Sequence, residues 1–232
     1  MKEIHILNLG VMNYSAVFDL MKELQRKRID GEISDKLIFV EHEEVVTLGP
    51  KAKREKTSVD DYPTFETDRG GGVTWHGPGQ LVVYPIIKWE GDMQNVRAVT
   101  GALEDWAVAA LADCGISSYK DEAMQGVWVD GYKVCSIGLS FLKWVSRHGM
   151  SINVNTPGDR VEGLSGCGLE EGVHTSLNKL GYKQDFDGLT VDTQRMQKAF
   201  ISTCEIVLKR RPVLEYPCLL YTSDAADEDL RV

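Results

Sequence analysis

The segment 69–80 of this 232-residue chain combines glycines with polar side chains in a way that suits ligand binding. It reads Arg-Gly-Gly-Gly-Val-Thr-Trp-His-Gly-Pro-Gly-Gln. Glycine lets the backbone adopt positive φ or approach a ligand closely, and the interspersed polar residues can hydrogen-bond to it. No Gly-Lys-Ser/Thr ends the segment, and the apolar residues 81–83 predict that a strand follows, so it is neither a Walker-type nor a dinucleotide-binding loop. A surface loop before a buried strand is the alternative, but a flexible linker would be more polar. We therefore predict the floor of a binding site.

Cys167 and Lys133 are two further residues with reactive side chains. Cys167 is flanked by glycine on both sides, so its thiol is sterically open and is a candidate nucleophile, although an idle loop thiol is the alternative. Lys133 follows an Asp-Gly hairpin signal and is predicted to lie just inside a strand, on the same side as Cys135 and Ile137. A lysine of an edge strand that reaches water is the commoner explanation of that pattern.

Hydrophobic periodicity and capping residues predict the elements that must position these side chains. Asn13 and Asp192 are suited to begin helices as N-caps, and Gly115 to follow a helix as its C′ residue. The predicted helices cover 14–28, 96–111 and 193–208, and the predicted strands cover 3–9, 37–40, 45–48, 81–83, 116–120, 127–129, 132–138 and 148–154. The basic run 51–56 is expected to be a loop, either a solvated surface or a docking site for an acidic protein partner.

Composition and charge restrict the class of protein. We expect a single domain over 1–217, and a disordered tail over 218–232 that need not belong to the natural protein. The net charge of −9 disfavours nucleic-acid binding. Neither a signal peptide nor a membrane-spanning segment is predicted, so we expect a cytoplasmic protein. The five cysteines lack a Cys-x-x-Cys pair and the five histidines lack metal-site spacing, so neither a disulfide framework nor a metal site is predicted.

Several motifs, taken in order, give the chain a specific resemblance to a known family. The motifs are Val40-Glu41-His42 with Thr47-Leu48-Gly49; Asp68-Arg69-Gly70-Gly71 with Thr74–Gln80; Gly131–Gly138; His148-Gly149 with Asn153-Val154-Asn155; and Cys167-Gly168 with Thr175-Ser176-Leu177. Over about Ile4 to Leu208 the chain resembles the lipoyl(octanoyl) transferases, the octanoyl-carrier-protein:protein octanoyltransferases. The resemblance implies an α/β (α+β) fold, the catalytic domain of the biotin and lipoate protein ligases, in which helices pack against a mixed β-sheet.

The resemblance also implies roles for individual residues. The nucleophile, which forms an acyl-enzyme, falls on Cys167, and the lysine that assists it falls on Lys133. The implied acyl and substrate pocket consists of Arg69, Gly70, Gly71, Gly72, Val73, Thr74, Trp75, His76, Ser136, Ile137, Gly138, Gly149, Met150 and Ser151. The chain departs from the family at Gly166, where proline is common, and at Met150-Ser151, where Leu/Phe-Ala is usual.

The implied reaction moves an octanoyl or lipoyl group from the phosphopantetheine arm of acyl carrier protein to a lysine of a lipoyl domain. The implied acceptors are the lipoyl domains of E2 subunits of 2-oxoacid dehydrogenase complexes and the glycine cleavage H protein. This transfer is the first committed step of endogenous protein lipoylation. It implies no cofactor, no metal and no ATP, and we expect a monomer that binds neither nucleic acid nor membrane.

The same resemblance suggests how the pocket is divided. Val73, Trp75 and Ile137 are expected to line the acyl slot, since burial of methylenes would set the chain length. Backbone N–H groups of 70–72, or those near Cys167, are expected to hold the thioester oxyanion. His76 is expected to orient the pocket, with a general-base role as the alternative.

Two other functions are compatible with parts of the sequence. An ATP-dependent lipoate–protein ligase would share the fold, but such relatives typically follow their glycines with His-Asp, where this chain has His76-Gly77-Pro78. A non-catalytic module that binds carrier protein is the second, and the presence of both Lys133 and Cys167 speaks against it. Consumption of ATP would indicate the ligase, and a lack of covalent acylation would indicate the binding module.

Overall fold

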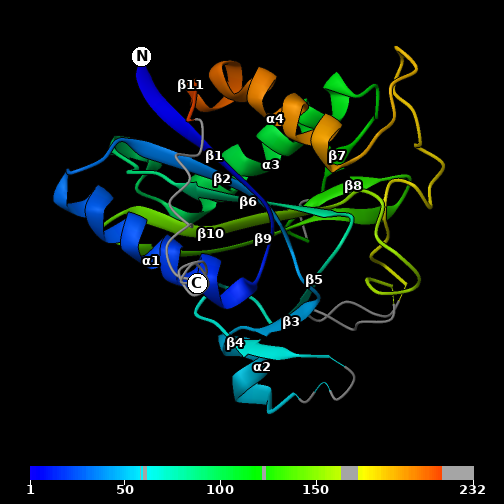
Figure 1. The fold of residues 1–232 in the computed structure, drawn as a ribbon, viewed down its shortest axis with the longest axis horizontal. Helices are drawn as coiled ribbons and strands as arrows, with labels where there is room; N and C mark the ends of the chain where they lie inside the picture. Colours follow the sequence, from blue (N-terminus) through cyan, green and yellow to red (C-terminus); the bar gives the residue numbers. More distant parts are fainter. Residues whose placement is uncertain (58, 60–61, 122–123, 163–171, 216–232) are drawn as a thin grey trace, which may run out of the picture.

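A mixed β-sheet with helices on both faces forms the centre of the protein (Figure 1). The computed structural model describes residues 1–57, 59, 62–121, 124–162 and 172–215. Within these residues the main sheet has eight strands in the order β11-β1-β2-β6-β10-β9-β8-β7. Their bounds are β1 (Lys2–Met12), β2 (Asp35–His42), β6 (Gln80–Ile86), β7 (Tyr119–Lys120), β8 (Val127–Val129), β9 (Tyr132–Leu142), β10 (Val145–Asn153) and β11 (Arg210–Leu214). β1 pairs in parallel with β2 and β11, and the remaining neighbours are antiparallel, which confirms the expected mixed sheet.

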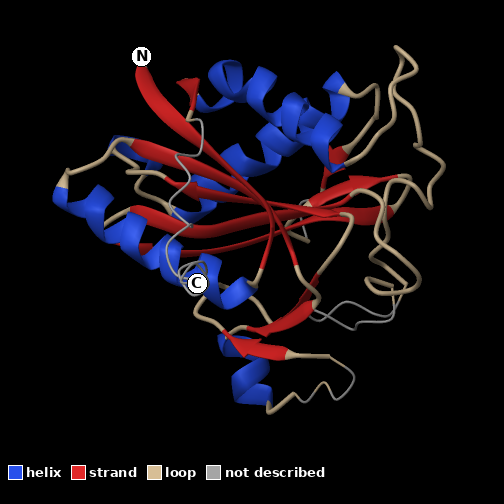
Figure 2. Cartoon of the chain, in the orientation of Figure 1, coloured by secondary structure: helices blue, strands red, loops and turns tan. Residues whose placement is uncertain are grey.

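The helices bury the two faces of this sheet. α1 (Tyr14–Asp30) covers one face, and α3 (Val96–Asp113) and α4 (Thr193–Leu208) cover the other (Figure 2). α1 buries Met21 against β2 and β6, and α3 buries Trp106 in the larger core that it shares with α4. A short 3₁₀ helix, η1 (Gly91–Met93), leads into α3.

The predicted helix ends are confirmed by their caps. The Asn13 side chain accepts a hydrogen bond from the Ser15 N–H at 3.0 Å, and the Asp192 side chain accepts one from the Arg195 N–H at 2.8 Å. Gly115, beyond the end of α3, has φ +74°, the left-handed conformation that glycine adopts most readily. Local sequence therefore sets where these helices begin and end.

Some segments differ from the prediction. The run 51–56 is not a loop, because α2 (Pro50–Glu55) begins at a proline, whose fixed φ suits the first turn, and it buries Ala52. β11 was not predicted. It pairs at the edge of the sheet, where the missing N–H of Pro212 is tolerated. The predicted strand 116–120 is shorter than expected, because only its last two residues pair as β7.

A second, smaller sheet carries the glycine-rich segment. Among the described residues it has three strands in the order β4-β3-β5, namely β3 (Val45–Leu48), β4 (Thr64–Glu66) and β5 (Val73–His76), and it projects from the main sheet with α2 at its end (Figure 1). Residues 67–72 connect β4 to β5, so the sheet fixes both ends of the glycine run. The expected tail, 218–232, lies outside the described residues, and the single domain over 1–217 stays a prediction. No helix in the described part of the chain is long and apolar enough to cross a membrane.

Candidate active site

A cavity of about 370 Å³ lies where the glycine-rich segment meets β9 and β10. The expected pocket residues that line it are Arg69, Gly70, Gly71, Thr74, His76, Ser136, Ile137, Gly138, Gly149, Met150 and Ser151. Lys133 lines it as well. Three separate stretches of the sequence thus meet around one cavity, whose volume is near the lower end of the range for small-molecule sites.

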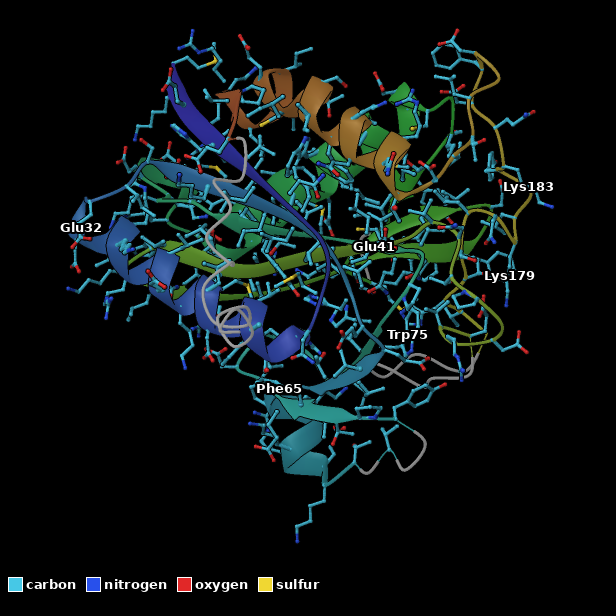
Figure 3. All side chains as sticks on the ribbon, in the orientation of Figure 1. Glu32, Glu41, Phe65, Trp75, Lys179 and Lys183 are labelled. Carbon is cyan, nitrogen blue, oxygen red and sulfur yellow. The ribbon has the colours of Figure 1, made fainter. Side chains whose placement is uncertain are left out.

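Three residues of the expected pocket do not line this cavity: Gly72, Val73 and Trp75. Val73 and Trp75 instead pack in the core of the small sheet, and Figure 3 shows Trp75 at that sheet. Successive side chains of a strand point to opposite faces, so Thr74 and His76 face the cavity while their neighbours face away. Of the three residues that were expected to line the acyl slot, Ile137 lines this cavity, whereas Val73 and Trp75 do not.

The Arg69 side chain folds under the glycine run and is only 6% exposed. Its guanidinium donates to the Thr47 carbonyl at 2.9 Å, to the Thr47 hydroxyl at 2.8 Å and to the Gly72 carbonyl at 3.0 Å. It also donates to the Gly70 carbonyl at 3.1 Å. The arginine thereby holds backbone carbonyls at both ends of the turn and fixes the shape of the cavity wall.

The glycine run also approaches β9 more closely than a side chain would allow. The Gly70 N–H donates to the Leu139 carbonyl at 3.0 Å. A Cβ built on Gly138 would lie 2.8 Å from the Gly70 oxygen and 3.3 Å from Cδ of Arg69. Gly138 therefore permits the contact that closes the cavity on this side.

Buried tyrosines and histidines form another part of the wall. The residues concerned are Tyr14, His76, Tyr84 and His148, with His42 behind them. His42 Nδ1 lies 3.1 Å from the Met12 carbonyl oxygen, which can only accept, so Nδ1 donates and the Tyr84 hydroxyl donates to Nε2 at 2.8 Å. Burial lowers the pKa of His42 to about 4, so this imidazole is neutral at pH 7.

His76 is held in one orientation by Gln80. The Gln80 amide nitrogen donates to the Asn153 side chain at 2.9 Å and to the Trp75 carbonyl at 3.1 Å, so its oxygen accepts from His76 Nδ1 at 2.7 Å. Burial keeps the pKa of His76 well below its ordinary value. A neutral imidazole fixed in this way suits an orienting group better than a base that must take up a proton at neutral pH.

Lys133 is a buried residue of a central strand, because β9 lies between β8 and β10. It is 6% exposed, so it is not an edge-strand lysine that reaches water. The register of β8 and β9 shifts between the Val127–Cys135 and Trp128–Lys133 pairs. This irregularity interrupts the simple alternation that was expected, since Lys133 lines the cavity while Cys135 packs in the main core.

The backbone of Lys133 pairs with the chain that follows the glycine-flanked cysteine. The Lys133 N–H donates to the Val173 carbonyl at 2.9 Å, and the Lys133 carbonyl accepts from the Thr175 N–H at 3.2 Å. The Gly172 N–H donates to the Glu162 carbonyl at 3.0 Å, and the Thr175 hydroxyl donates to the Glu162 carboxylate at 3.0 Å. Cys167 itself lies outside the described residues, but the residues that precede and follow its segment meet beside Lys133.

Comparison with known proteins identifies the family. Residues 13–201 match the lipoyl protein ligase A/B catalytic domain. The octanoyltransferase of Syntrophobacter fumaroxidans is 35% identical over 187 residues, which cover 78% of this chain and 82% of the relative. That of Magnetococcus marinus is 39% identical over 171 residues, which cover 74% and 79% respectively. The chain belongs to the octanoyltransferase family.

This octanoyltransferase is thus an acyltransferase enzyme, and it shares its fold with ligases. A lipoate-protein ligase A bound with ATP superposes with a TM-score of 0.64 at 13% identity, over 93% of this chain and 90% of the ligase. The biotin protein ligase of Aquifex aeolicus superposes with a TM-score of 0.51 at 14% identity, over 90% and 69%. The expected ligase-like catalytic fold is confirmed, and at such low identity these structures show the fold alone.

The cysteines of the octanoyltransferase that the structure describes are all buried. Burial raises the pKa of Cys114 to about 11 and that of Cys135 and Cys204 to about 12, so these groups remain thiols at neutral pH. Cys204, on α4, packs in the main core. Among the described residues, no group of three or more histidine, cysteine and acidic side chains is arranged to hold a metal ion.

Sequence reasoning missed an ionic cluster next to the cavity of this octanoyltransferase. Asp68 accepts from the Arg147 guanidinium and from His148 Nε2, the latter at 2.8 Å. The hydrogen bond from His148, together with the charge of Arg147, holds the pKa of Asp68 well below its usual range. His148 has φ +61°, which is unusual for a residue with a Cβ and is a mark of a constrained site. Asp68 and His148 both belong to the motifs that carry the family resemblance, and this is the sequence signal from which the cluster could have been predicted.

Proposed function

We propose that this octanoyltransferase moves an octanoyl group from acyl carrier protein to a lipoyl-domain lysine through a thioester on Cys167, assisted by Lys133. The observation that carries the proposal is the pairing of Lys133 with Val173 and Thr175, which holds the chain after Cys167 against the strand that presents the lysine. Lys133 also lines the cavity, so an acyl group bound there lies beside the lysine side chain.

In the first step the Cys167 sulfur attacks the carbonyl carbon of the acyl thioester. An ordinary thiol, with a pKa of about 8.5, is mostly protonated at neutral pH, and the Lys133 ammonium favours its thiolate. The new C–S bond forms as the bond to phosphopantetheine sulfur breaks, and the departing carrier thiolate takes a proton from the Lys133 ammonium, which leaves Lys133 neutral. The Gly70 N–H already donates to the Leu139 carbonyl, so the backbone N–H of Gly71, at the cavity wall, is our candidate to hold the oxyanion.

In the second step the ε-amine of a lipoyl-domain lysine attacks the Cys167 thioester. A C–N bond forms, the C–S bond breaks, and the product is an octanoyl amide with Cys167 restored as a thiol. The attacking amine must lose a proton, and we propose that Lys133, neutral after the first step, accepts it and returns it to the departing Cys167 sulfur. Exchange of one thioester for another is nearly balanced and conversion to an amide is downhill, so the reaction requires neither ATP nor a cofactor.

The donor is proposed to dock on α2. The Lys51 N–H donates to the Gly71 carbonyl at 3.3 Å, so α2 is attached directly to the cavity wall. Lys53, Arg54 and Lys56 are exposed on a chain whose net charge is −9, and this local basic surface suits the acidic carrier protein. An arm that enters beside Gly71 would reach the cavity from there.

The remaining parts of the proposal come from the family. The acceptors are lipoyl domains of E2 subunits and of the glycine cleavage H protein. The enzyme acts in the cytoplasm as a monomer, and the substrate is carried on the phosphopantetheine of acyl carrier protein.

The test is transfer with purified components. The protein is mixed with octanoyl-carrier protein and a lipoyl domain, with and without ATP, and the mass of the lipoyl domain is measured over time. A lipoyl domain that lacks its acceptor lysine is the control. We expect one octanoyl group per lipoyl domain at a rate that ATP does not change, and no transfer from free octanoate with ATP. Transfer only from free octanoate and ATP would indicate a ligase, and carrier binding without transfer would indicate a non-catalytic module.

A further inference from the structure

The side chain of Lys133 has a close neighbour in Gly126, the residue just before β8. A Cβ built on Gly126 would lie 2.5 Å from Lys133 Cε and 3.2 Å from its Nζ. The same Cβ would lie 2.4 Å from the Cys135 carbonyl oxygen. Gly126 has φ +127°, a backbone conformation that residues with side chains rarely adopt. The lysine therefore passes over this position only because it is glycine.

A carboxylate from another element holds Gly126 in place. The Gly126 N–H donates to Oε1 of Glu104 at 2.8 Å, and Glu104 belongs to α3. α3 is anchored in the main core by fully buried residues such as Leu103 and Trp106. Hydrogen bonds to a charged acceptor are among the stronger ones, so this bond ties the backbone beneath Lys133 to a rigid helix.

The irregular register of β8 and β9 explains why this support is needed. Val127 pairs with Cys135 and Trp128 with Lys133, so one additional β9 residue lies between the two pairs. Such a bulge locally interrupts the ladder and redirects the side chains beside it. Regular ladder pairing is interrupted here, and the hydrogen bond from the Gly126 N–H to the Glu104 carboxylate holds the backbone instead.

We propose that Gly126 and Glu104 are positioning residues, which together form a seat that fixes the Lys133 side chain at the cavity wall. The proposal rests on the function proposed above for Lys133. Gly126 provides the surface over which the lysine methylenes lie, and the Glu104 carboxylate holds that surface by accepting the Gly126 N–H. Neither residue need touch the substrate.

The test measures single-turnover formation of the acyl-enzyme from octanoyl-carrier protein. For Gly126→Ala we expect the maximal rate to fall by about 30-fold or more, comparable to Lys133→Ala, with little change in the half-saturating carrier concentration. The matched control is Gly131→Ala. Gly131 has φ +85° in the adjacent turn but no heavy atom within 4 Å of its Cβ position, so it reports the effect of backbone strain alone.

A second pair of variants leaves the glycine intact, in case Gly126→Ala does not fold. Glu104→Ala should lower the maximal rate by about 10-fold, and Glu104→Gln, whose amide oxygen can still accept the Gly126 N–H, should restore most of that loss. Gly126→Ala or Glu104→Ala at the wild-type maximal rate would overturn the seat. If instead the wild type forms no acyl-enzyme, or Lys133→Ala acylates at the wild-type rate, the proposed function itself fails.

Discussion

Replacement of His42 by glutamine should reduce the acid sensitivity of the fold. His42 is fully buried behind the cavity wall, and burial lowers its pKa from 6.5 to about 4. Between pH 6.5 and about pH 4 the unfolded chain binds a proton on His42 and the folded chain does not. Acidification therefore stabilises the unfolded state, and the stability that the neutral imidazole provides at pH 7 is lost as the pH falls from 6.5 to about 4.

The size of this effect follows from the two pKa values. One pKa unit corresponds to about 1.4 kcal/mol, so the loss from His42 alone is about 2 kcal/mol at pH 5 and about 3 kcal/mol at pH 4. A loss of this size is a large part of the 5–15 kcal/mol typical of a folded domain. Glutamine can still donate and accept hydrogen bonds at this position but does not titrate.

The assay is urea unfolding of the wild type and of His42→Gln at pH 7 and at pH 5. His76, His148 and His174 also have lowered pKa values, but they contribute equally to both proteins and cancel in the comparison. We expect the variant to lose about 2 kcal/mol less than the wild type between the two pH values. An identical loss in both proteins would refute the neutral, buried state of His42.

Two further predictions concern the glycine contact and the docking surface. Gly138→Ala should destabilise the protein by about 1–3 kcal/mol and slow acyl transfer, because its Cβ would lie 2.8 Å from the Gly70 oxygen. Thermal unfolding measures the loss of stability, and a single-turnover assay measures the rate of acyl transfer. Gly101→Ala, with no heavy atom near its Cβ position, is the control, and equal behaviour of the two variants would contradict the close contact. Reversal of charge at Lys53 and Arg54 should lower kcat/KM for octanoyl-carrier protein about 10-fold at low salt and leave transfer from a small octanoyl thioester unchanged. An equal loss of kcat/KM with octanoyl-carrier protein and with the small octanoyl thioester would exclude docking on α2.

Much of the scaffold could be predicted because it depends on local signals. The caps at Asn13 and Asp192 fixed two helices, and the Asp130-Gly131 turn fixed the hairpin that carries Lys133. Conversely, a basic run that reads as a solvated loop forms α2 because of Pro50. Residues close together in the sequence therefore determine each of these features.

The arrangement around the cavity depends on strand phase and long-range register. The opposite faces of Thr74 and Trp75 follow from the two-residue period of β5, a pattern that is visible in the sequence. The approach of His42 to Tyr84 depends instead on how β2 pairs with β6, and no local pattern contains that information. The bulge that places Lys133 beside Gly126 likewise depends on how β8 pairs with β9.

The most direct test of the account is the intact mass of the protein after incubation with octanoyl-carrier protein. The wild type should gain one octanoyl group, Cys167→Ser should gain none as a thioester, and Lys133→Ala should gain it more slowly. Hydroxylamine should remove the group from the wild type, since a thioester is labile to it. A wild type that gains no octanoyl group, or an adduct that persists unchanged in Cys167→Ser, would contradict the acyl-enzyme mechanism.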